Sequence, residues 1–327
     1  MSGVAYVFPG QGSQGVGMAR AVAQAFPPAT AVFATADASL AEPLTQLAWD
    51  GPAEELDLTA NAQPAILAAS IAFLRALEAA RGAAGVPTLQ PAFYAGHSMG
   101  QYSALVAADV IDLADGLRLV RERGRQMQAA GGDGAMAALI GLDDARLPDL
   151  VRVGQAHGVF GVANRNSPGQ VVVSGERRAV EAAVEAAREL GARRAVLLPV
   201  SVAAHSPLMA PAAAGMRPVL APVAFRAPRA PLLANADARP LPTGEACRAE
   251  LVEHLTTGVD WVAAVDAMRA AGVTTFIEVG PGRVLTGLVK RIAPDALAIA
   301  LDDPGAPDGL APQALAAEPT IPAQPTT

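Results

Sequence analysis

The sequence predicts an α/β protein in which a smaller lobe interrupts a larger domain. Short apolar runs alternate with alanine-rich segments of helical periodicity, which is typical of a parallel sheet covered by helices. Residues 132–203 instead follow a β-α-β-β-α-β order, that of a split βαβ unit. A Gly-x-Ser-x-Gly pentapeptide at 96–100 stands between a strand pattern and a helix pattern, as expected of an α/β enzyme.

Residues 1–131 are expected to form the first part of the larger domain. The apolar run 4–8 is stopped by Pro9 and Gly10, and the run 92–95 leads into the pentapeptide, so both are predicted to be buried strands. Periodicity predicts helices at 18–26, 30–40, 62–80 and 101–108, and one from the N-cap candidate Asp112 to about residue 130.

The pattern changes after residue 132 and changes back near residue 204. Within the lobe, strands are predicted at 136–141, 159–164, 170–174 and 194–200, with helices at 143–155 and 176–190. The larger domain resumes over 204–302, with helices predicted at 245–255, 262–271 and 284–292 and a strand at 275–279. Residues 303–327 are rich in proline and alanine without apolar periodicity, so this tail is predicted to be disordered.

The composition excludes several classes of protein. Of the 327 residues, 52% are hydrophobic and 17% are charged, which excludes a chain disordered throughout. A formal net charge of −7 argues against binding nucleic acid through its phosphates. One cysteine, Cys247, rules out an internal disulfide, and the absence of ligand clusters predicts no metal or other cofactor. Without a signal-type N-terminus or a long apolar run, the chain is expected to be cytoplasmic and to make no membrane contact.

The pentapeptide Gly96-His97-Ser98-Met99-Gly100 fits a nucleophile elbow. Its glycines allow a strand to turn sharply into a helix, and the turn presents the serine hydroxyl at the helix N-terminus. Backbone N–H groups there can face a developing oxyanion. The competing interpretation is a glycine-rich turn in which Ser98 only caps the helix.

A nucleophilic serine needs a base, and the chain contains four histidines. His205 lies on the loop where the lobe rejoins the larger domain, so it is the candidate base. His97 adjoins the serine, where neighbouring side chains diverge, and is expected to be structural. His157 and His254 lie near the ends of predicted helices and are interpreted as surface residues.

An ordinary hydrolase triad has an acid between the serine and the histidine in the sequence. The acids between Ser98 and His205 fall on solvated helix faces, as those within 181–189 do, or in the turn at 143–144. Either the acid comes later in the chain, or a neutral group such as a backbone carbonyl orients the histidine. This gap counts against a generic lipase or esterase.

The helix predicted from Asp112 carries four arginines in two groups. Its apolar seam is formed by Leu113, Leu117, Val120, Gly124 and Met127. Arg118, Arg121 and Arg125 cluster on one flank and the opposite face, where they are expected to be solvated. Arg123 falls on the other flank and is interpreted either as a rim salt bridge or as a bidentate clamp for a carboxylate.

Six blocks of sequence carry a family resemblance. They are VFPGQGSQ at 7–14, NAQPAIL at 61–67, AGHSMGQYSALVAADVIDLADGLRLVRERGRQMQ at 95–128, NSPGQVVVSG at 166–175, LPVSVAAHSPLM at 198–209 and IEVGPGRVLTGLVKRI at 277–292. In this order and spacing they resemble the malonyl-CoA:acyl carrier protein transacylases of fatty acid synthesis, relatives of polyketide acyltransferase domains. The resemblance implies an α/β-hydrolase-like larger domain at 1–131 and 204–302 with an inserted ferredoxin-like lobe at 132–203.

The resemblance also implies roles for individual residues. Ser98 matches the nucleophile that becomes malonylated, and His205 matches its general base. Gln11 and Met99 match the backbone N–H donors of the oxyanion hole. Arg123 matches the partner of the malonyl carboxylate.

Other matches are less direct. Gln63 matches a residue of the family's pocket, and Asn166 lies in the segment near the substrate. His254 matches the position whose main-chain carbonyl orients the histidine, although relatives often have glutamine there. Gly258 is a second departure, because proline is usual at that position.

The implied activity is ping-pong transfer of a malonyl group from malonyl-CoA to the phosphopantetheine thiol of an acyl carrier protein, by a monomer. Three alternatives stay open: a polyketide or malonate-decarboxylase malonyltransferase, a thioesterase-type hydrolase, and a non-catalytic carrier-binding module. The complete set of matched residues argues against the last. Ala204 precedes His205, where polyketide relatives carry Phe for malonyl and Ser for methylmalonyl, so the choice of acyl group is not decided.

An acidic carrier protein requires a local basic patch on a chain of negative net charge. Two patches are candidates. The first is Lys290 and Arg291 with Arg283, and the second is Arg188, Arg193 and Arg194 on the lobe.

Overall fold

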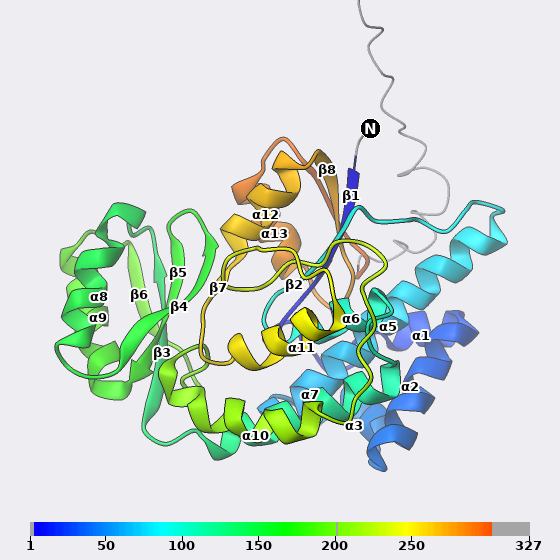
Figure 1. The fold of residues 1–327 in the computed structure, drawn as a ribbon, viewed down its shortest axis with the longest axis horizontal. Helices are drawn as coiled ribbons and strands as arrows, with labels where there is room; N and C mark the ends of the chain where they lie inside the picture. Colours follow the sequence, from blue (N-terminus) through cyan, green and yellow to red (C-terminus); the bar gives the residue numbers. More distant parts are fainter. Residues whose placement is uncertain (1–2, 201, 303–327) are drawn as a thin grey trace, which may run out of the picture.

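The computed structural model describes residues 3–200 and 202–302. Its first sheet has four parallel strands in the order β2-β1-β8-β9 (Figure 1). These strands are β1 (Gly3–Phe8), β2 (Phe93–Gly96), β8 (Val273–Glu278) and β9 (Leu297–Ala300). Because Phe8 pairs with Gly96, the loops that follow β1 and β2 leave the same edge of the sheet together.

Helices cover both faces of this sheet, which explains why its strands are almost continuously apolar. Tyr6 and Phe8 belong to one core with α5 and α6, whereas Ala5 and Val7 belong to a second core with α12 and α13. The helices around this sheet are α1 (Arg20–Ala25), α2 (Pro27–Leu40), α3 (Leu44–Asp50), α4 (Ala53–Leu56), α5 (Thr59–Ala83), α6 (Gly100–Ala107), α7 (Leu113–Ala129), α10 (Ala210–Leu220), α11 (Gly244–Glu253), α12 (Trp261–Ala270) and α13 (Val284–Ile292).

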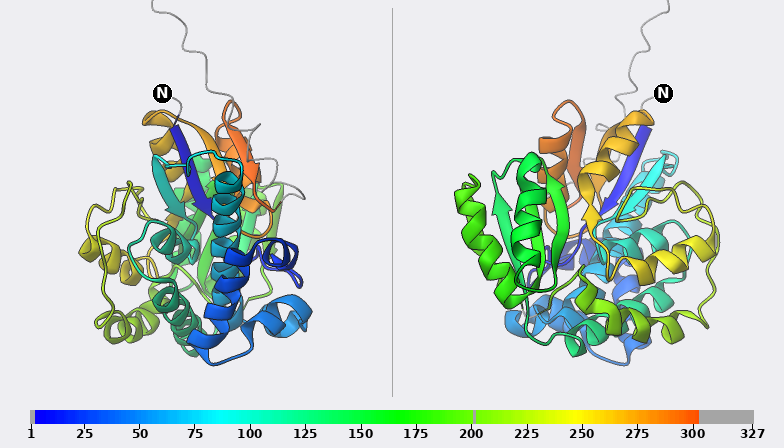
Figure 2. Two further views of the ribbon diagram at one scale, coloured as in Figure 1. Left: turned by 90° about the vertical axis from the view of Figure 1, so that its right-hand side faces the viewer. Right: turned by 60° about the vertical axis from the view of Figure 1, so that its left-hand side comes forward.

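A second sheet has five strands in the order β6-β3-β5-β4-β7. They are β3 (Gly134–Ile140), β4 (Phe160–Ser167), β5 (Gln170–Glu176), β6 (Arg194–Leu197) and β7 (Val259–Asp260). Its outer face packs on α8 (Leu147–Gln155) and α9 (Arg177–Glu189) and has its own apolar core (Figure 2). The β-α-β-β-α-β order predicted for 132–203 is present, but β7 joins β4 from far outside that range.

Several elements differ from the sequence prediction. α3, α4, α10 and β9 were not predicted. α10 contains Pro211 and Pro218, and prolines in a sequence usually indicate a loop. Pro211, however, stands in the first turn of the helix, where no helical N–H bond is lost. β6 ends at Leu197 rather than at residue 200, since Pro199 has no N–H to extend the ladder.

The residue predicted to cap the N-terminus of α7 stands at that position but does not cap the helix with its side chain. Asp112 is the N-cap of α7, but its carboxylate accepts a hydrogen bond from Arg226 Nη2 at 2.7 Å instead of capping the helix. The tail predicted at 303–327 lies outside the described residues. Within 3–200 and 202–302, none of the helices combines the length and the apolar character needed to cross a bilayer.

Candidate active site

The pentapeptide forms a sharp turn between β2 and α6. Ser98 has φ of 54°, in the left-handed region that a non-glycine residue rarely adopts. A Cβ atom at Gly96 would lie 2.1 Å from the Gly100 carbonyl carbon, and one at Gly100 would lie 2.2 Å from the Phe8 carbonyl oxygen. The turn therefore requires both glycines, and it directs the Ser98 side chain into the space beyond the strand ends.

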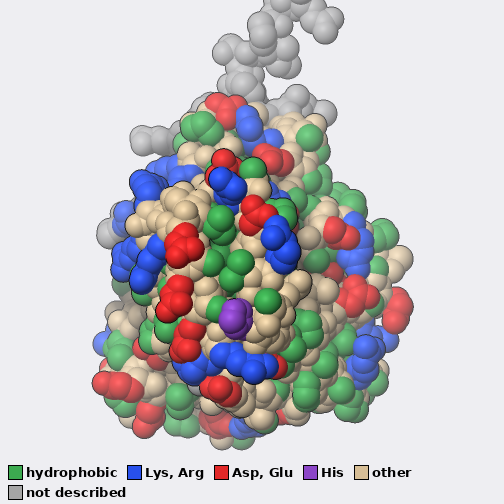
Figure 3. Space-filling model, turned by 90° about the vertical axis from the view of Figure 1, so that its left-hand side faces the viewer, with side chains coloured by type: hydrophobic (Ala, Val, Ile, Leu, Met, Phe, Trp, Pro, Cys, Tyr) green, Lys and Arg blue, Asp and Glu red, His purple; other side chains and the backbone are tan. Residues whose placement is uncertain are grey.

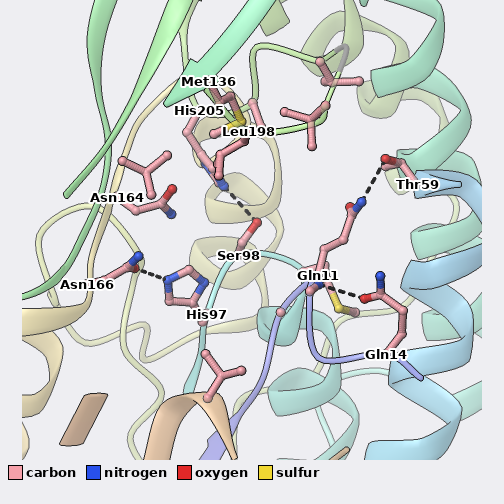
Figure 4. A pocket seen from close by; sticks show the side chains of 18 of the residues that line it. Gln11, Gln14, Thr59, His97, Ser98, Met136, Asn164, Asn166, Leu198 and His205 are labelled. Carbon is pink, nitrogen blue, oxygen red and sulfur yellow. Dashed lines mark hydrogen bonds between the residues drawn. The ribbon is translucent and has the colours of Figure 1, made fainter. Parts of the chain in front are cut away.

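His205 meets this serine from the loop between β6 and α10. The distance from Ser98 Oγ to His205 Nε2 is 2.8 Å (Figure 4). His205 Nδ1 lies 2.7 Å from the His254 carbonyl oxygen and 3.0 Å from that of Thr257. Because carbonyl oxygens only accept, Nδ1 carries the proton and Nε2 is free to accept one from Ser98. Two backbone carbonyls thus occupy the place of the acid of an ordinary triad.

The surroundings of His205 keep it neutral. Burial lowers the pKa of its imidazole to about 4, and the positive charge of Arg123 acts in the same direction. At neutral pH the ring is therefore in the state that can accept a proton.

We expect the rate of Ser98 acylation to be flat between about pH 6 and pH 8 and to fall as the pH approaches 4, because protonated His205 cannot accept the serine proton. Single-turnover acylation followed by intact mass at each pH measures this. Thermal unfolding is the control, since burial also lowers the pKa of His97 and His254, and folding stability decreases as pH falls below 6.5. An acid limb centred on 6.5 in folded enzyme would contradict the assignment.

Arg123 on α7 is buried, with 1% of its surface exposed. Its Nη1 donates to Gln63 Oε1 at 2.8 Å and its Nη2 to Ser98 Oγ at 3.2 Å. Its guanidinium also lies over the Tyr102 ring, 6.0 Å from the centroid. Burial lowers its pKa, and within the described residues no carboxylate pairs with it. A buried guanidinium beside a nucleophile, without a protein counter-ion, is suited to bind an anionic substrate group.

Of the two interpretations of Arg123, the rim salt bridge is excluded, because only 1% of the residue is exposed and no carboxylate among the described residues pairs with it. Arg121, expected to be solvated, is also buried: its Nη2 pairs with a Glu42 carboxylate oxygen at 2.6 Å and its Nη1 donates to the Ala60 carbonyl at 2.8 Å. The reason is that α2 and α5 both pack on α7, so the helix has more than one covered side.

Gln63 lies behind Arg123 rather than in the cavity. Its side chain is fully buried, with Oε1 on Arg123 and Nε2 donating to Met127 Sδ at 3.7 Å. It can fix the direction of the guanidinium without touching a substrate.

Two residues that line the cavity with Ser98 have backbone N–H groups without a protein acceptor among the described residues. Met99 begins the turn into α6, and Gln11 follows β1; both residues line the cavity. Within the described part of the chain, neither N–H donates a hydrogen bond. The Gln11 side chain points away and donates to Thr59 Oγ1 at 3.1 Å (Figure 4). Neither N–H is therefore committed to a protein acceptor among the described residues.

The other histidines have separate surroundings. His97 Nε2 lies 2.9 Å from Asn166 Oδ1 on β4, so it links the two sheets and does not contact the serine hydroxyl (Figure 4). His157 is exposed after α8, as expected. His254 is not a surface residue: its ring is buried between Tyr102 and His205, with centroids 6.1 Å and 6.2 Å away.

These groups surround a cavity of about 500 Å³ between the two sheets. Ser98 and His205 line it, and the second sheet contributes both apolar side chains, Met136 and Val172, and polar ones, Asn164, Asn166 and Gln170. Val284 and Leu288 of α13 line it as well. The cavity is far larger than a small acyl group, so it has room for a longer, partly apolar ligand as well.

Sequence reasoning missed two groups that contact the catalytic pair. Thr257 supplies a second carbonyl to His205, and Asn235 accepts a hydrogen bond from the Ser98 N–H at 2.8 Å. Thr257 acts through its backbone and has no side-chain signal. The only hint of Asn235 in the sequence is a polar residue directly after the apolar run at 232–234.

A family model described as the acyl transferase domain matches residues 5–300. The chain belongs to this acyl transferase family. It is 47% identical to a malonyl CoA-acyl carrier protein transacylase of Escherichia coli strain K12 over 308 residues, which are 94% of this chain and 98% of the relative. It is 41% identical to the enzyme of that name from Bacillus subtilis strain 168, over 93% of this chain and 95% of the relative.

Solved structures agree with this acyltransferase assignment. An acyl-carrier-protein-S-malonyltransferase from Bartonella henselae has a TM-score of 0.89 and 44% identity, over 94% of this chain and 98% of that chain. A malonyl-transacylase in complex with its type II PKS acyl-carrier protein has a TM-score of 0.89 and 43% identity, over 94% and 99%.

Proposed function

We propose that this acyltransferase moves a malonyl group from malonyl-CoA to the phosphopantetheine thiol of an acyl carrier protein, through an ester on Ser98. The observation that carries the proposal is Arg123, a buried cation 3.2 Å from Ser98 Oγ that has no counter-ion among the described residues. A malonyl thioester has a carboxylate two bonds beyond its reactive carbonyl, so one group can bind Arg123 while the other meets Ser98. The names of the relatives support the same substrates.

In the first half-reaction His205 Nε2 accepts the Ser98 proton as Oγ attacks the thioester carbonyl. The tetrahedral oxyanion is stabilised by the N–H groups of Gln11 and Met99. When the intermediate collapses, the C–S bond breaks and the coenzyme A sulfur takes the proton from His205. The products are malonyl-Ser98 and free coenzyme A.

The second half-reaction is the reverse with another thiol. His205 accepts the proton of the phosphopantetheine thiol, and the sulfur attacks the malonyl ester. The C–O bond to Ser98 breaks, and the serine oxygen takes the proton back. Arg123 holds the carboxylate in both halves, so the acyl carbonyl keeps one orientation toward both attacking groups.

A hydrolase of similar architecture is the competing enzyme class. If this chain is a transferase, mixing it with malonyl-CoA alone should give one equivalent of coenzyme A rapidly and a persistent malonyl-enzyme. Adding acyl carrier protein should then discharge the adduct. Steady release of free malonate without any acceptor thiol would show a thioesterase instead.

We propose a fatty acid pathway for the carrier, since relatives named malonyl CoA-acyl carrier protein transacylase match 93–94% of this chain at 41–47% identity. A polyketide pathway is the second candidate, because the complex with a type II PKS carrier protein is similar at 43% identity. Acyl-enzyme masses after malonyl-, methylmalonyl- and acetyl-CoA, followed by transfer to each carrier, distinguish the two and define the acyl preference.

We further propose an α/β-hydrolase-like domain at 1–131 and 204–302 and a ferredoxin-like insert at 132–203. The parallel sheet with its elbow after β2 supports the first, and the antiparallel β3–β6 with two helices on one face support the second. The catalytic groups described above come from one chain, so we propose that a monomer is the active unit.

Two pairs of basic residues, each on a segment that is continuous with residues lining the cavity, are proposed as alternative docking sites for an acidic carrier protein. Lys290 and Arg291 lie on α13, the helix that lines the cavity with Val284. Arg193 and Arg194 lie at the start of β6, just before the lining segment 198–200. Figure 3 shows both signs of charge on the face of α8 and α9, so docking depends on local patches rather than on the net charge.

Charge reversal distinguishes these patches. Reversing the pair that docks, either Arg193 and Arg194 or Lys290 and Arg291, should raise KM for carrier protein by about tenfold and leave malonyl-enzyme formation unchanged, because only the second half-reaction needs the carrier. The other pair serves as the matched control. An unchanged KM in both double variants would remove both patches from consideration.

A further inference from the structure

Asn235 contacts the backbone of the nucleophile. Its side-chain Oδ1 accepts the Ser98 N–H at 2.8 Å, and only 4% of the residue is exposed. Ser98 holds a left-handed φ of 54°, a conformation that persists only where the surroundings enforce it. A bond to the Ser98 N–H fixes the peptide plane that leads into the turn.

Both the backbone N–H and the backbone carbonyl of Asn235 form hydrogen bonds. Its N–H donates to Glu250 Oε1 at 2.7 Å, and its carbonyl accepts the Asp260 N–H at 2.7 Å. Glu250 is also buried, with 1% exposed, and its other oxygen lies 3.4 Å from Arg239 Nη1. A buried carboxylate used in this way leaves the asparagine little freedom to move.

Glu250 belongs to α11, and the end of that helix orients the base. The Glu250 carbonyl accepts the His254 N–H at 2.9 Å, so the two residues are one helical turn apart. The His254 carbonyl in turn accepts from His205 Nδ1 at 2.7 Å. The contacts therefore form a closed ring: Ser98, Asn235, Glu250, the end of α11, His205 and back to Ser98 Oγ.

We propose that Asn235 and Glu250 are positioning residues that hold Ser98 and His205 in a fixed position relative to each other. This inference rests on the proposed function, since it concerns the same Ser98–His205 pair. Without the Asn235 oxygen, the Ser98 peptide can rotate, which displaces Oγ from His205 and redirects the Met99 N–H that follows it. Displacements of about 1 Å at such a site cost about 100-fold in rate.

The first test is Asn235→Ala, compared with Asn235→Asp, which keeps an oxygen acceptor in the same place. We expect Asn235→Ala to lower the single-turnover acylation rate by about 100-fold while KM for malonyl-CoA changes by less than about threefold, because Arg123 still binds the carboxylate. The single-turnover acylation rate of Asn235→Asp should be at least about tenfold higher than that of Asn235→Ala. Circular dichroism and thermal unfolding show whether each variant is folded.

The Glu250 variants keep the inference testable if Asn235→Ala does not fold. Glu250→Gln retains an oxygen that can accept the Asn235 N–H, so acylation should stay within about threefold of the wild type. Glu250→Ala should lower it toward the Asn235→Ala value. Glu253→Gln is the matched control, because Glu253 lies on the same helix and pairs with the same Arg239, at 2.8 Å, but has an exposed side chain.

The outcomes separate this inference from the proposed function. A wild-type enzyme that forms no malonyl-enzyme would overturn the proposed function itself. If the wild type forms it and folded Asn235→Ala does so within threefold of the same rate, the positioning role is wrong. An equal loss in Asn235→Ala and Asn235→Asp, or a tenfold loss in Glu250→Gln, would also contradict it.

Discussion

Replacing Ser98 by alanine should abolish the malonyl-enzyme and lower acyl transfer by about 10⁴-fold or more. The reason is that Ser98 supplies the only hydroxyl in contact with both His205 Nε2, at 2.8 Å, and Arg123 Nη2, at 3.2 Å, within the described residues. Without it no covalent intermediate can form, and only direct thiol exchange is left. Intact-mass measurement after mixing with malonyl-CoA should show one adduct in the wild type and none in the variant.

Ser103→Ala is the matched control for this prediction. Ser103 lies on α6, the helix that begins at the elbow, and it is fully buried away from the cavity. The control variant should acquire one malonyl group as the wild type does. An adduct that survives Ser98→Ala would refute the nucleophile, and peptide mapping would then locate the residue that carries it.

The sharp turn that presents Ser98 could be predicted from the sequence because its geometry is local. The turn has no room for a side chain at positions 96 and 100, and both positions lie in the same pentapeptide as Ser98. The pairing with His205 spans 107 positions, and the sequence alone indicated it only through elimination of the other histidines and the family resemblance.

Contacts made through the backbone leave little trace in a sequence. The carbonyls of His254 and Thr257 orient His205, and any residue type supplies a carbonyl. Asn235 acts through its side chain, but its partner is the Ser98 N–H, 137 positions away. Such contacts can be identified only in the folded structure. The sequence therefore indicates that a triad acid is missing, but not which groups orient His205 in its place.

Periodicity identified the buried seam of α7 but not what packs on its flanks. Arg121 and Arg123 are two residues apart and project on different sides, yet both are buried. Arg121 pairs with the Glu42 carboxylate, whereas Arg123 donates to the neutral oxygens of Gln63 and Ser98 and pairs with no carboxylate in the part of the chain that the structure describes. The difference in charge compensation, rather than in burial, makes Arg123 the candidate for substrate recognition.

Replacing Arg123 by alanine should lower malonyl loading by about 10³-fold and acetyl loading by less than about tenfold. Removing one partner of a buried charged pair costs about 3–5 kcal/mol, and each 1.4 kcal/mol corresponds to tenfold. Acetyl-CoA has no carboxylate and loses only the contact of Arg123 Nη2 with Ser98 Oγ. Single-turnover acylation with each thioester gives the ratio, and equal losses for the two substrates would contradict the carboxylate-binding role.

Arg125→Ala is the matched control, because Arg125 lies two residues further along α7, is exposed and pairs with Glu42 at 3.0 Å. It should leave both loading rates within about twofold of the wild type.

The same Arg123→Ala variant tests the electrostatics of the base. Burial, and after it the positive charge of Arg123, lower the pKa of His205 to about 4, so removing Arg123 should raise that pKa in part, with burial still holding it below 6.5, and move the acid limb of acetyl loading to higher pH. If a malonyl carboxylate binds Arg123 as proposed, it compensates the same charge without removing the arginine. We therefore expect His205 to be more basic with malonyl-CoA bound than with acetyl-CoA bound, because an acetyl group carries no charge. An acid limb that stays near pH 4 in Arg123→Ala would show that burial alone keeps His205 neutral, and selectivity would then rest on carboxylate binding only.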